Sequence, residues 1–132
     1  MSGPIRHVGI VVPVANEEDL LGRCLQALQV TRTVAATRHP DVGPIRIVLA
    51  LDACTDASAA IAARHAGVET VAVDVRAVGP ARALGVAHLL GTGPRGSAQH
   101  TWIANTDADS EVSPGWLAGM LDEAARGAQV VL

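Results

Sequence analysis

The stretch Thr101-Trp102-Ile103-Ala104-Asn105-Thr106-Asp107-Ala108-Asp109-Ser110-Glu111 decides how the chain is interpreted. It begins as an apolar run typical of a buried strand, and it ends in three carboxylates within five residues. Crowded carboxylates repel one another. A divalent cation relieves that repulsion, and carboxylate oxygens suit Mg²⁺, Mn²⁺ or Ca²⁺. The alternative is a polar loop between a strand and a helix, with Ser113 capping the helix.

Apolar runs of strand length recur before and after this stretch. They are continuous rather than alternating, which is typical of parallel strands buried on both faces. Strands are expected at residues 8–14, 45–51, 68–75, 101–106 and 129–132. The segments between them carry helix-start signals. Helices are expected to begin after Asn16 and Asp56, which act as caps, at Gly79-Pro80 with Pro80 in the first helical position, and at Ser113-Pro114.

This alternation of strands and helices over residues 1–132 predicts a single domain of the α/β class. The expected architecture is a Rossmann-like three-layer α/β/α sandwich with a mostly parallel sheet and right-handed crossovers. The core should be aliphatic, since Trp102 and Trp116 are the only aromatic residues, and both are expected to be buried. The first helix should bury one apolar stripe. Its members are Leu20, Leu21, Cys24, Leu25 and Leu28.

Polar side chains gather where three of the expected strands end. The segments are Pro13 to Glu17, Asp52 to Asp56, and Asp107 to Glu111. In open parallel sheets, ligands bind at the carboxyl ends of the strands, where the strand order reverses. Three polar strand ends on one edge of the sheet therefore indicate a binding site, whereas a single acidic loop would not.

Composition excludes several other classes of function. A net charge of −3 argues against binding to nucleic acid or to an anionic membrane surface, both of which need a basic patch. Cys24 and Cys54 are too few for a disulfide framework. No uncharged apolar run is long enough to span a membrane, and the first residues do not resemble a secretory signal, so a cytoplasmic location is expected.

The turn after the first strand, Pro13-Val14-Ala15-Asn16-Glu17-Glu18, is not a glycine-rich phosphate cradle. A dinucleotide-dependent dehydrogenase or a P-loop nucleotidase is therefore disfavoured. A nucleotidyltransferase would carry a basic glycine-rich loop here, and a phosphatase with an Asp-x-Asp motif would place it on the first strand. Phosphate could instead be held by Asp107 and Asp109 through a cation, with Arg82 adding positive charge near a helix N-terminus.

The chain resembles the nucleotide-sugar-binding half of a family 2 glycosyltransferase with the GT-A fold. Four segments carry the resemblance, in the order in which the family has them. They are Val11-Val12-Pro13-Val14-Ala15-Asn16-Glu17-Glu18, Leu51-Asp52-Ala53-Cys54-Thr55-Asp56, Gly79-Pro80-Ala81-Arg82-Ala83-Leu84-Gly85, and Thr106-Asp107-Ala108-Asp109 with Pro114-Gly115-Trp116-Leu117. The chain departs from the family at Ala15, where an aromatic residue is usual, and at Ala53, Cys54 and Ala83, which leaves the preferred base open.

The resemblance implies a role for each site residue. The residues implied to bind the nucleotide sugar are Pro13, Val14, Ala15, Glu17, Asp52, Arg82, Asp107 and Ala108. Within this set, Asp52 is expected to accept a hydrogen bond from the base, and Arg82 to lie near the base or the diphosphate. Asp109, with Asp107, is expected to ligate Mn²⁺ or Mg²⁺. The implied reaction is transfer of a sugar from a UDP- or GDP-type donor to an acceptor, with inversion.

No residue of the chain matches the general base that such a transfer needs. In the family, that base and the acceptor pocket lie beyond the point that corresponds to Leu132. The expectation is therefore a donor-binding domain without the acceptor-binding part, whose exposed sheet edge is covered by a homodimer. The alternative is a nucleotide- or metal-binding module with no transfer activity of its own, or one completed by a partner chain.

Overall fold

The computed structural model describes residues 4–129, and they form one parallel sheet with helices on both faces. The strands are β1 (His7–Val14), β2 (Ile45–Asp52), β3 (Val68–Val73) and β4 (Thr101–Asn105). The helices are α1 (Leu21–Arg38), α2 (Ser58–Ala63), α3 (Val78–Gly91) and α4 (Trp116–Ala125), with a short 3₁₀ helix at Ala98–His100. The strand expected at 129–132 lies, apart from Gln129, outside the described residues.

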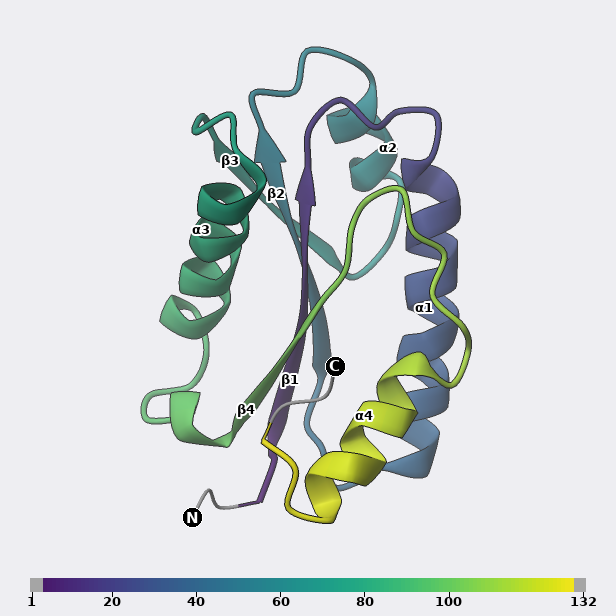
Figure 1. The fold of residues 1–132 in the computed structure, drawn as a ribbon, viewed down its shortest axis with the longest axis vertical. Helices are drawn as coiled ribbons and strands as arrows, with labels where there is room; N and C mark the ends of the chain where they lie inside the picture. Colours follow the sequence, from purple (N-terminus) through teal and green to yellow (C-terminus); the bar gives the residue numbers. More distant parts are fainter. Residues whose placement is uncertain (1–3, 130–132) are drawn as a thin grey trace.

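The strand order is β3-β2-β1-β4, and every neighbouring pair is parallel. Helix α3 covers one face of the sheet, while α1, α2 and α4 lie on the other (Figure 1). The chain moves outward from β1 to β3 and then crosses back to β4 on the far side of β1. The predicted Rossmann-like α/β/α sandwich is therefore confirmed, and the strand order reverses between β1 and β4.

Strand β1 is at the centre of the core. Ile10 and Val12 are fully buried among the residues that α1 contributes, whereas Val11 faces Leu89 of α3 on the opposite side of the sheet. The predicted stripe of α1 is confirmed at Leu21, Cys24, Leu25 and Leu28, but Leu20 is 40% exposed. Leu20 lies before the helix begins, so the helical spacing does not extend to it. Trp102 is buried, and Trp116 is partly buried against the same core.

Helix α3 lies close to the sheet because two glycines provide the space. A Cβ atom on Gly9 would come within 2.2 Å of the Leu89 side chain, and a Cβ atom on Gly85 would come within 2.7 Å of Val11 Cγ1. Real Cβ atoms are not found at such distances, so a side chain at either position would require Leu89, Val11 or α3 itself to move. The apolar periodicity of the sequence does not reveal this close approach.

The starts of α1 and α3 differ from the expectation, whereas that of α2 agrees with it. Asn16 does not cap α1, which begins five residues later at Leu21, because Asn16 adopts a left-handed conformation with φ 53°. Pro80 lies in the first turn of α3 as its third residue rather than its first, where a missing N–H still costs no helical hydrogen bond. Asp56 does accept a hydrogen bond from the N–H of Ser58, at 2.9 Å, as α2 begins.

Helix α4 is capped by a residue of α1 rather than by Ser113. The Thr31 hydroxyl accepts a hydrogen bond from the N–H of Leu117 at 3.1 Å and donates one to the carbonyl of Pro114 at 2.9 Å. Thr31 is fully buried, and its partners lie 83 and 86 residues away in the sequence. One hydroxyl therefore satisfies a backbone donor and a backbone acceptor where α4 meets α1.

Within residues 4–129, no helix has the length and apolarity needed to cross a membrane.

We expect Thr31→Val to lower the free energy of unfolding by about 1–3 kcal/mol, because it leaves the buried N–H of Leu117 and the carbonyl of Pro114 without their partner. Valine has nearly the same shape as threonine, so packing is retained. Thr33→Val is the matched control, since Thr33 is exposed on the same helix and bonds only the carbonyl of Gln29. That control should change stability by no more than ~0.5 kcal/mol. Equal effects of the two substitutions in urea denaturation would contradict the capping role.

Candidate functional site

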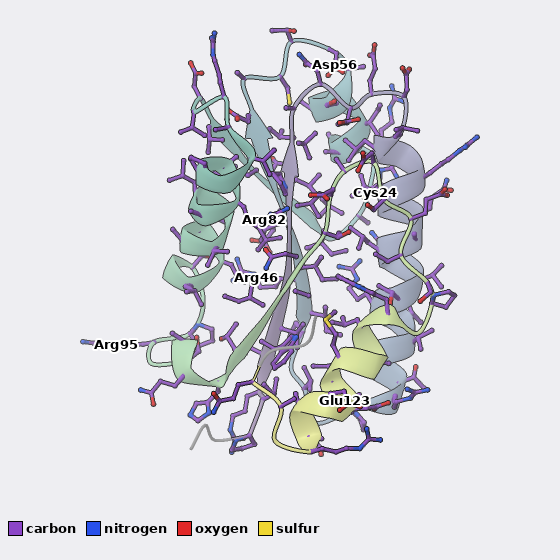
Figure 2. All side chains as sticks on the ribbon, in the orientation of Figure 1. Cys24, Arg46, Asp56, Arg82, Arg95 and Glu123 are labelled. Atoms are coloured by element: carbon purple, nitrogen blue, oxygen red, sulfur yellow. The ribbon has the colours of Figure 1, made fainter. Side chains whose placement is uncertain are left out.

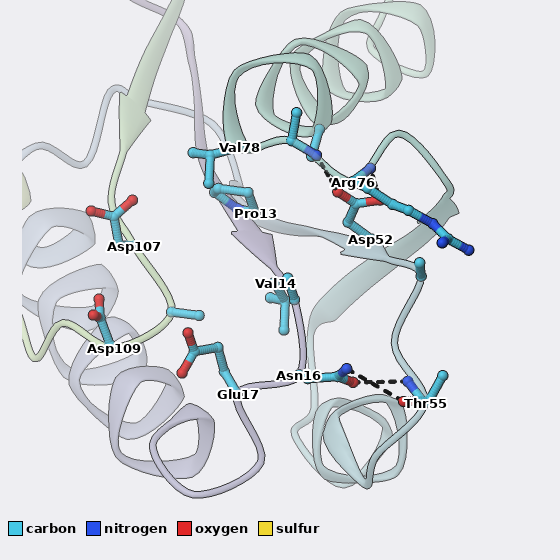
Figure 3. Close-up of a pocket in the computed structure, with 15 residues that line it drawn as sticks. Pro13, Val14, Asn16, Glu17, Asp52, Thr55, Arg76, Val78, Asp107 and Asp109 are labelled. Atoms are coloured by element: carbon cyan, nitrogen blue, oxygen red, sulfur yellow. Dashed lines mark hydrogen bonds between the residues drawn. The ribbon is translucent and has the colours of Figure 1, made fainter.

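A cavity of about 590 Å³ opens at the carboxyl ends of the strands, where β1 and β4 lie side by side and the strand order reverses. Its walls come from the segments that follow β1, β2, β3 and β4 (Figure 3). The lining residues are Pro13, Val14, Ala15, Asn16, Glu17, Asp52, Ala53, Thr55, Arg76, Ala77, Val78, Ala81, Asp107, Ala108 and Asp109. The structure thus brings together every residue expected at the site except Arg82.

Arg82 lies on α3 beside this cavity, and it reaches the acidic loop directly. Its Nη2 donates to Oδ1 of Asp107 at 2.8 Å. The Arg82 side chain is 31% exposed and that of Asp107 is 62% exposed, so solvent weakens the ion pair without abolishing it. The Nε–H of Arg82 is buried and has no hydrogen-bond partner among the described residues. The guanidinium therefore has donors that Asp107 does not use.

The acidic loop after β4 exposes its carboxylates to solvent, while its backbone contacts α1. Asp107 and Asp109 are exposed, and Figure 3 shows Asp107 above Asp109, with Glu17 nearer Asp109. Behind them Ala108 is buried, and the Cys24 thiol donates to the backbone carbonyl of Asp107 at 3.6 Å. Burial, followed by the charge of Asp109, raises the pKa of Cys24 to about 11. The thiol is thus protonated at neutral pH and can act as a donor.

The donor set of this loop fits a hard divalent cation that is completed by a ligand. Over residues 4–129, no three His, Cys, Asp or Glu side chains are grouped so that they could hold a metal ion by themselves. Asp107 and Asp109 offer two carboxylates, and one oxygen of Asp107 is already paired with Arg82. Mg²⁺ is commonly bound through one or two carboxylates together with substrate phosphates and water. These two carboxylates alone would leave most coordination positions of such a cation to other ligands.

Asp52 holds the loop between β3 and α3. Its Oδ1 accepts the N–H groups of Val75 and Arg76, both at 2.9 Å, and its Oδ2 accepts the N–H of Ala77 at 3.0 Å. These hydrogen bonds, that of Arg76 first, hold the pKa of Asp52 below its usual value. A carboxylate can accept about four hydrogen bonds, so roughly one position remains free. Asp52 can still face a ligand, but most of its capacity is used within the protein.

Asn16 joins the loops that follow β1 and β2. Its Oδ1 accepts the N–H groups of Thr55 at 2.8 Å and Asp56 at 3.2 Å, while its Nδ2 donates to Thr55 Oγ1 at 3.3 Å. Glu17 N–H in turn donates to Ser58 Oγ at 3.0 Å, and Glu18 N–H donates to Asp56 Oδ2 at 3.1 Å. The segment that the sequence suggested as a helix cap is therefore a connection between two loops of the cavity.

Three residues of the cavity have positive φ although none is glycine. They are Asn16 at 53°, Ala53 at 49° and Arg76 at 52°, one in each of the loops after β1, β2 and β3. Asparagine tolerates this conformation better than alanine or arginine does. Such residues persist where surrounding interactions determine the backbone, and they are concentrated at ligand sites. Among residues 4–129, non-glycine residues with positive φ occur only in the walls of the cavity.

Sequence reasoning missed the wall formed after β3. Arg76, Ala77 and Val78 line the cavity, yet the sequence offers only Asp74 and Arg76 as polar residues at this strand end. This wall could have been expected from the topology, because β3 is parallel to β1 and β2 and must end at the same edge of the sheet. Thr55 was also missed, since its contact with Asn16 joins residues 39 apart in the chain.

Comparison with solved structures supports the same fold. The crystal structure of S. aureus TarS matches with a TM-score of 0.57 and 15% sequence identity. The match covers 89% of this chain and 19% of the TarS chain, so the present sequence spans about a fifth of that protein's length. At this identity the likeness concerns the fold alone. A search of curated proteins finds no significant match.

A family model provides the assignment. The model of glycosyl transferase family 2 matches residues 9–132, which is nearly the whole chain and includes every residue of the cavity. This match agrees with the parallel sheet, the acidic loop after β4 and the site at the carboxyl ends of the strands. We conclude that the chain belongs to glycosyl transferase family 2.

Proposed function

We propose that the cavity binds the nucleoside diphosphate part of a sugar donor, with Mn²⁺ or Mg²⁺ bound between the diphosphate and the acidic loop. The observation that carries this proposal is the juxtaposition of two kinds of surface in one cavity. Small apolar side chains and backbone form one wall, while Asp107, Asp109 and the nearby Arg82 supply the charges on the other. A nucleoside diphosphate has the same division between a base with flat apolar faces and a charged end.

The nucleoside would lie against Pro13, Val14 and Ala15 of β1 and its following loop, with Glu17 beside it. The loop after β3 faces this segment, and Val78 lies near Pro13 in Figure 3. Val78 is 58% exposed and lines the cavity, so its side chain is accessible to a ligand there. The remaining acceptor position on Asp52 would receive a hydrogen bond from the base.

The diphosphate would lie near Asp107, Ala108 and Asp109. When bound, the cation would neutralise the charge that develops on the leaving diphosphate as the bond to the sugar breaks. Arg82 would orient Asp107 through their ion pair and offer its remaining donors to phosphate oxygens. The Cys24 thiol fixes the backbone of Asp107 on the side away from the ligand.

Transfer of the sugar also requires an acceptor and a group that deprotonates its hydroxyl. We assign no such base among residues 4–129. The activity proposed for these residues is thus binding of the sugar donor. Transfer of the sugar to an acceptor requires a general base in addition. The acceptor and the inverting stereochemistry are proposals that rest on the family alone.

We expect at least one of UDP, GDP, CDP and ADP to raise the melting temperature, and to do so more strongly with Mn²⁺ or Mg²⁺. At a concentration of 100 times Kd, a ligand stabilises the folded state by about 2.7 kcal/mol. For a domain of this size, that corresponds to a shift on the order of 10 °C. Thermal denaturation across the four nucleotides, with and without metal, measures this. No shift with any of them would refute donor binding.

Asp109→Asn should abolish the metal dependence of nucleotide binding and leave the melting temperature of the free protein unchanged. The carboxylate is exposed, so the fold does not need its charge, whereas a cation does. Glu111→Gln is the matched control, because it removes an exposed carboxylate two residues further along the same loop. Calorimetric titration with and without Mn²⁺ compares the two. Loss of metal dependence in the control alone would place the cation elsewhere.

Arg82→Gln should weaken binding of the nucleoside diphosphate by about ten- to a hundredfold while leaving the affinity for the bare nucleoside unchanged. Hydrogen bonds to charged groups contribute about 1.5–3 kcal/mol, and the nucleoside has no phosphate to receive one. Arg95→Gln makes the same change in net charge at a residue that projects from the far end of the molecule (Figure 2). An equal loss for both variants would show that overall charge, rather than Arg82, is responsible.

A further inference from the structure

We propose that Asp52 is a positioning residue, whose carboxylate builds the wall of the cavity formed by residues 75–77 before any ligand binds. The consequence for nucleotide binding rests on the proposed function, but the positioning itself does not. In this arrangement Asp52 acts on the donor mainly through the loop that it holds, in addition to any contact with the base.

Residues 75–77 form an anion-binding nest, a concavity lined by successive backbone N–H groups, and the anion in it is the Asp52 carboxylate. Three consecutive N–H groups, those of Val75, Arg76 and Ala77, converge on one carboxylate at 2.9, 2.9 and 3.0 Å. Successive amides arranged around a residue with positive φ form concavities that bind anions, and Arg76 has φ 52°. Asp52 is only 5% exposed and fills this concavity from the end of β2.

Other interactions of this loop are weak by comparison. Val75, Arg76, Ala77 and Val78 are all exposed, so little apolar burial holds the loop in place. The ion pair between Arg76 and Asp74 joins two side chains that are 78% and 68% exposed, and such pairs add little stability. The left-handed conformation of Arg76 is unfavourable by itself. The three hydrogen bonds to Asp52 are therefore the main interaction that maintains the shape of this wall.

The wall affects two parts of the cavity at once. Arg76, Ala77 and Val78 line it, and Figure 3 shows Asp52 beneath them with its hydrogen bonds to the loop. Ala77 is also the residue from which α3 begins, and α3 carries Arg82. By fixing Ala77, Asp52 sets both the surface offered to a nucleoside and the start of the helix that carries the arginine.

The test is amide hydrogen exchange of the nucleotide-free protein, comparing Asp52→Asn with the wild type. Asparagine replaces one accepting oxygen by an N–H₂ group, which cannot accept these amides. The remaining oxygen is neutral, so the amides that still reach it have weaker hydrogen bonds. We expect faster exchange at residues 75–77, by at least about tenfold where the amide loses its acceptor. Asp56→Asn is the matched control, because Asp56 accepts from Glu18 and Ser58 instead. It should accelerate exchange at those residues and leave 75–77 unchanged.

A second variant tests the nest directly. Asp52→Ala removes the carboxylate and leaves the three amides facing a space that formate can enter. Formate should then restore slow exchange at residues 75–77 in Asp52→Ala and have no such effect in the wild type. If binding of the nucleoside diphosphate is measured in parallel, formate should restore affinity together with protection.

The outcomes separate the two proposals. Unchanged exchange at 75–77 in Asp52→Asn would overturn the positioning role, and weaker nucleotide binding in that case would assign Asp52 a direct contact with the base only. Faster exchange at 75–77 with formate rescue would support the positioning role even if the wild-type protein binds no nucleotide, a result that would refute the proposed function alone.

Discussion

Backbone amides at the carboxyl edge of the sheet need hydrogen-bond partners that the strands no longer supply, and side chains from neighbouring loops meet this need. The carboxylate of Asp52 serves the loop after β3, and the amide group of Asn16 serves the loop after β2. In both cases the acceptor belongs to the adjacent loop, so satisfying the amides also ties neighbouring loops together. The shape of the cavity follows from these hydrogen bonds between neighbouring segments.

The cavity is consequently asymmetric. The loops after β1, β2 and β3 are cross-linked through Asn16, Asp52 and Asp56, and they contain the strained residues. The acidic loop after β4 is approached from other elements by Arg82 of α3 and by Cys24 of α1. The apolar side of the cavity is thus held by hydrogen bonds within the protein, whereas the charged side keeps a guanidinium donor that no described residue uses.

Much of the fold could be predicted from the sequence, because continuous apolar runs specify buried parallel strands and parallel strands end at one edge. The acidic loop and Asp52 could be placed on that edge for the same reason. What could not be predicted depends on partners distant in the chain. Asn16 has the composition of a helix cap but bonds residues 39 and 40 positions later, and Thr31 caps a helix 86 positions away. Local propensity contains no information about such pairs.

The glycines beneath α3 have a consequence for the site although neither one touches it. Gly85 lies three residues beyond Arg82, on the face of the helix that meets Val11 and Ala50. Because Gly9 and Gly85 have no side chains, α3 lies close to the sheet. This position of α3 also determines how near Arg82 lies to Asp107. A methyl group added at Gly85 would therefore act on the ion pair of Arg82 and Asp107 without any change of charge. Residues that line no part of the cavity can thus affect the position of the charged groups beside it.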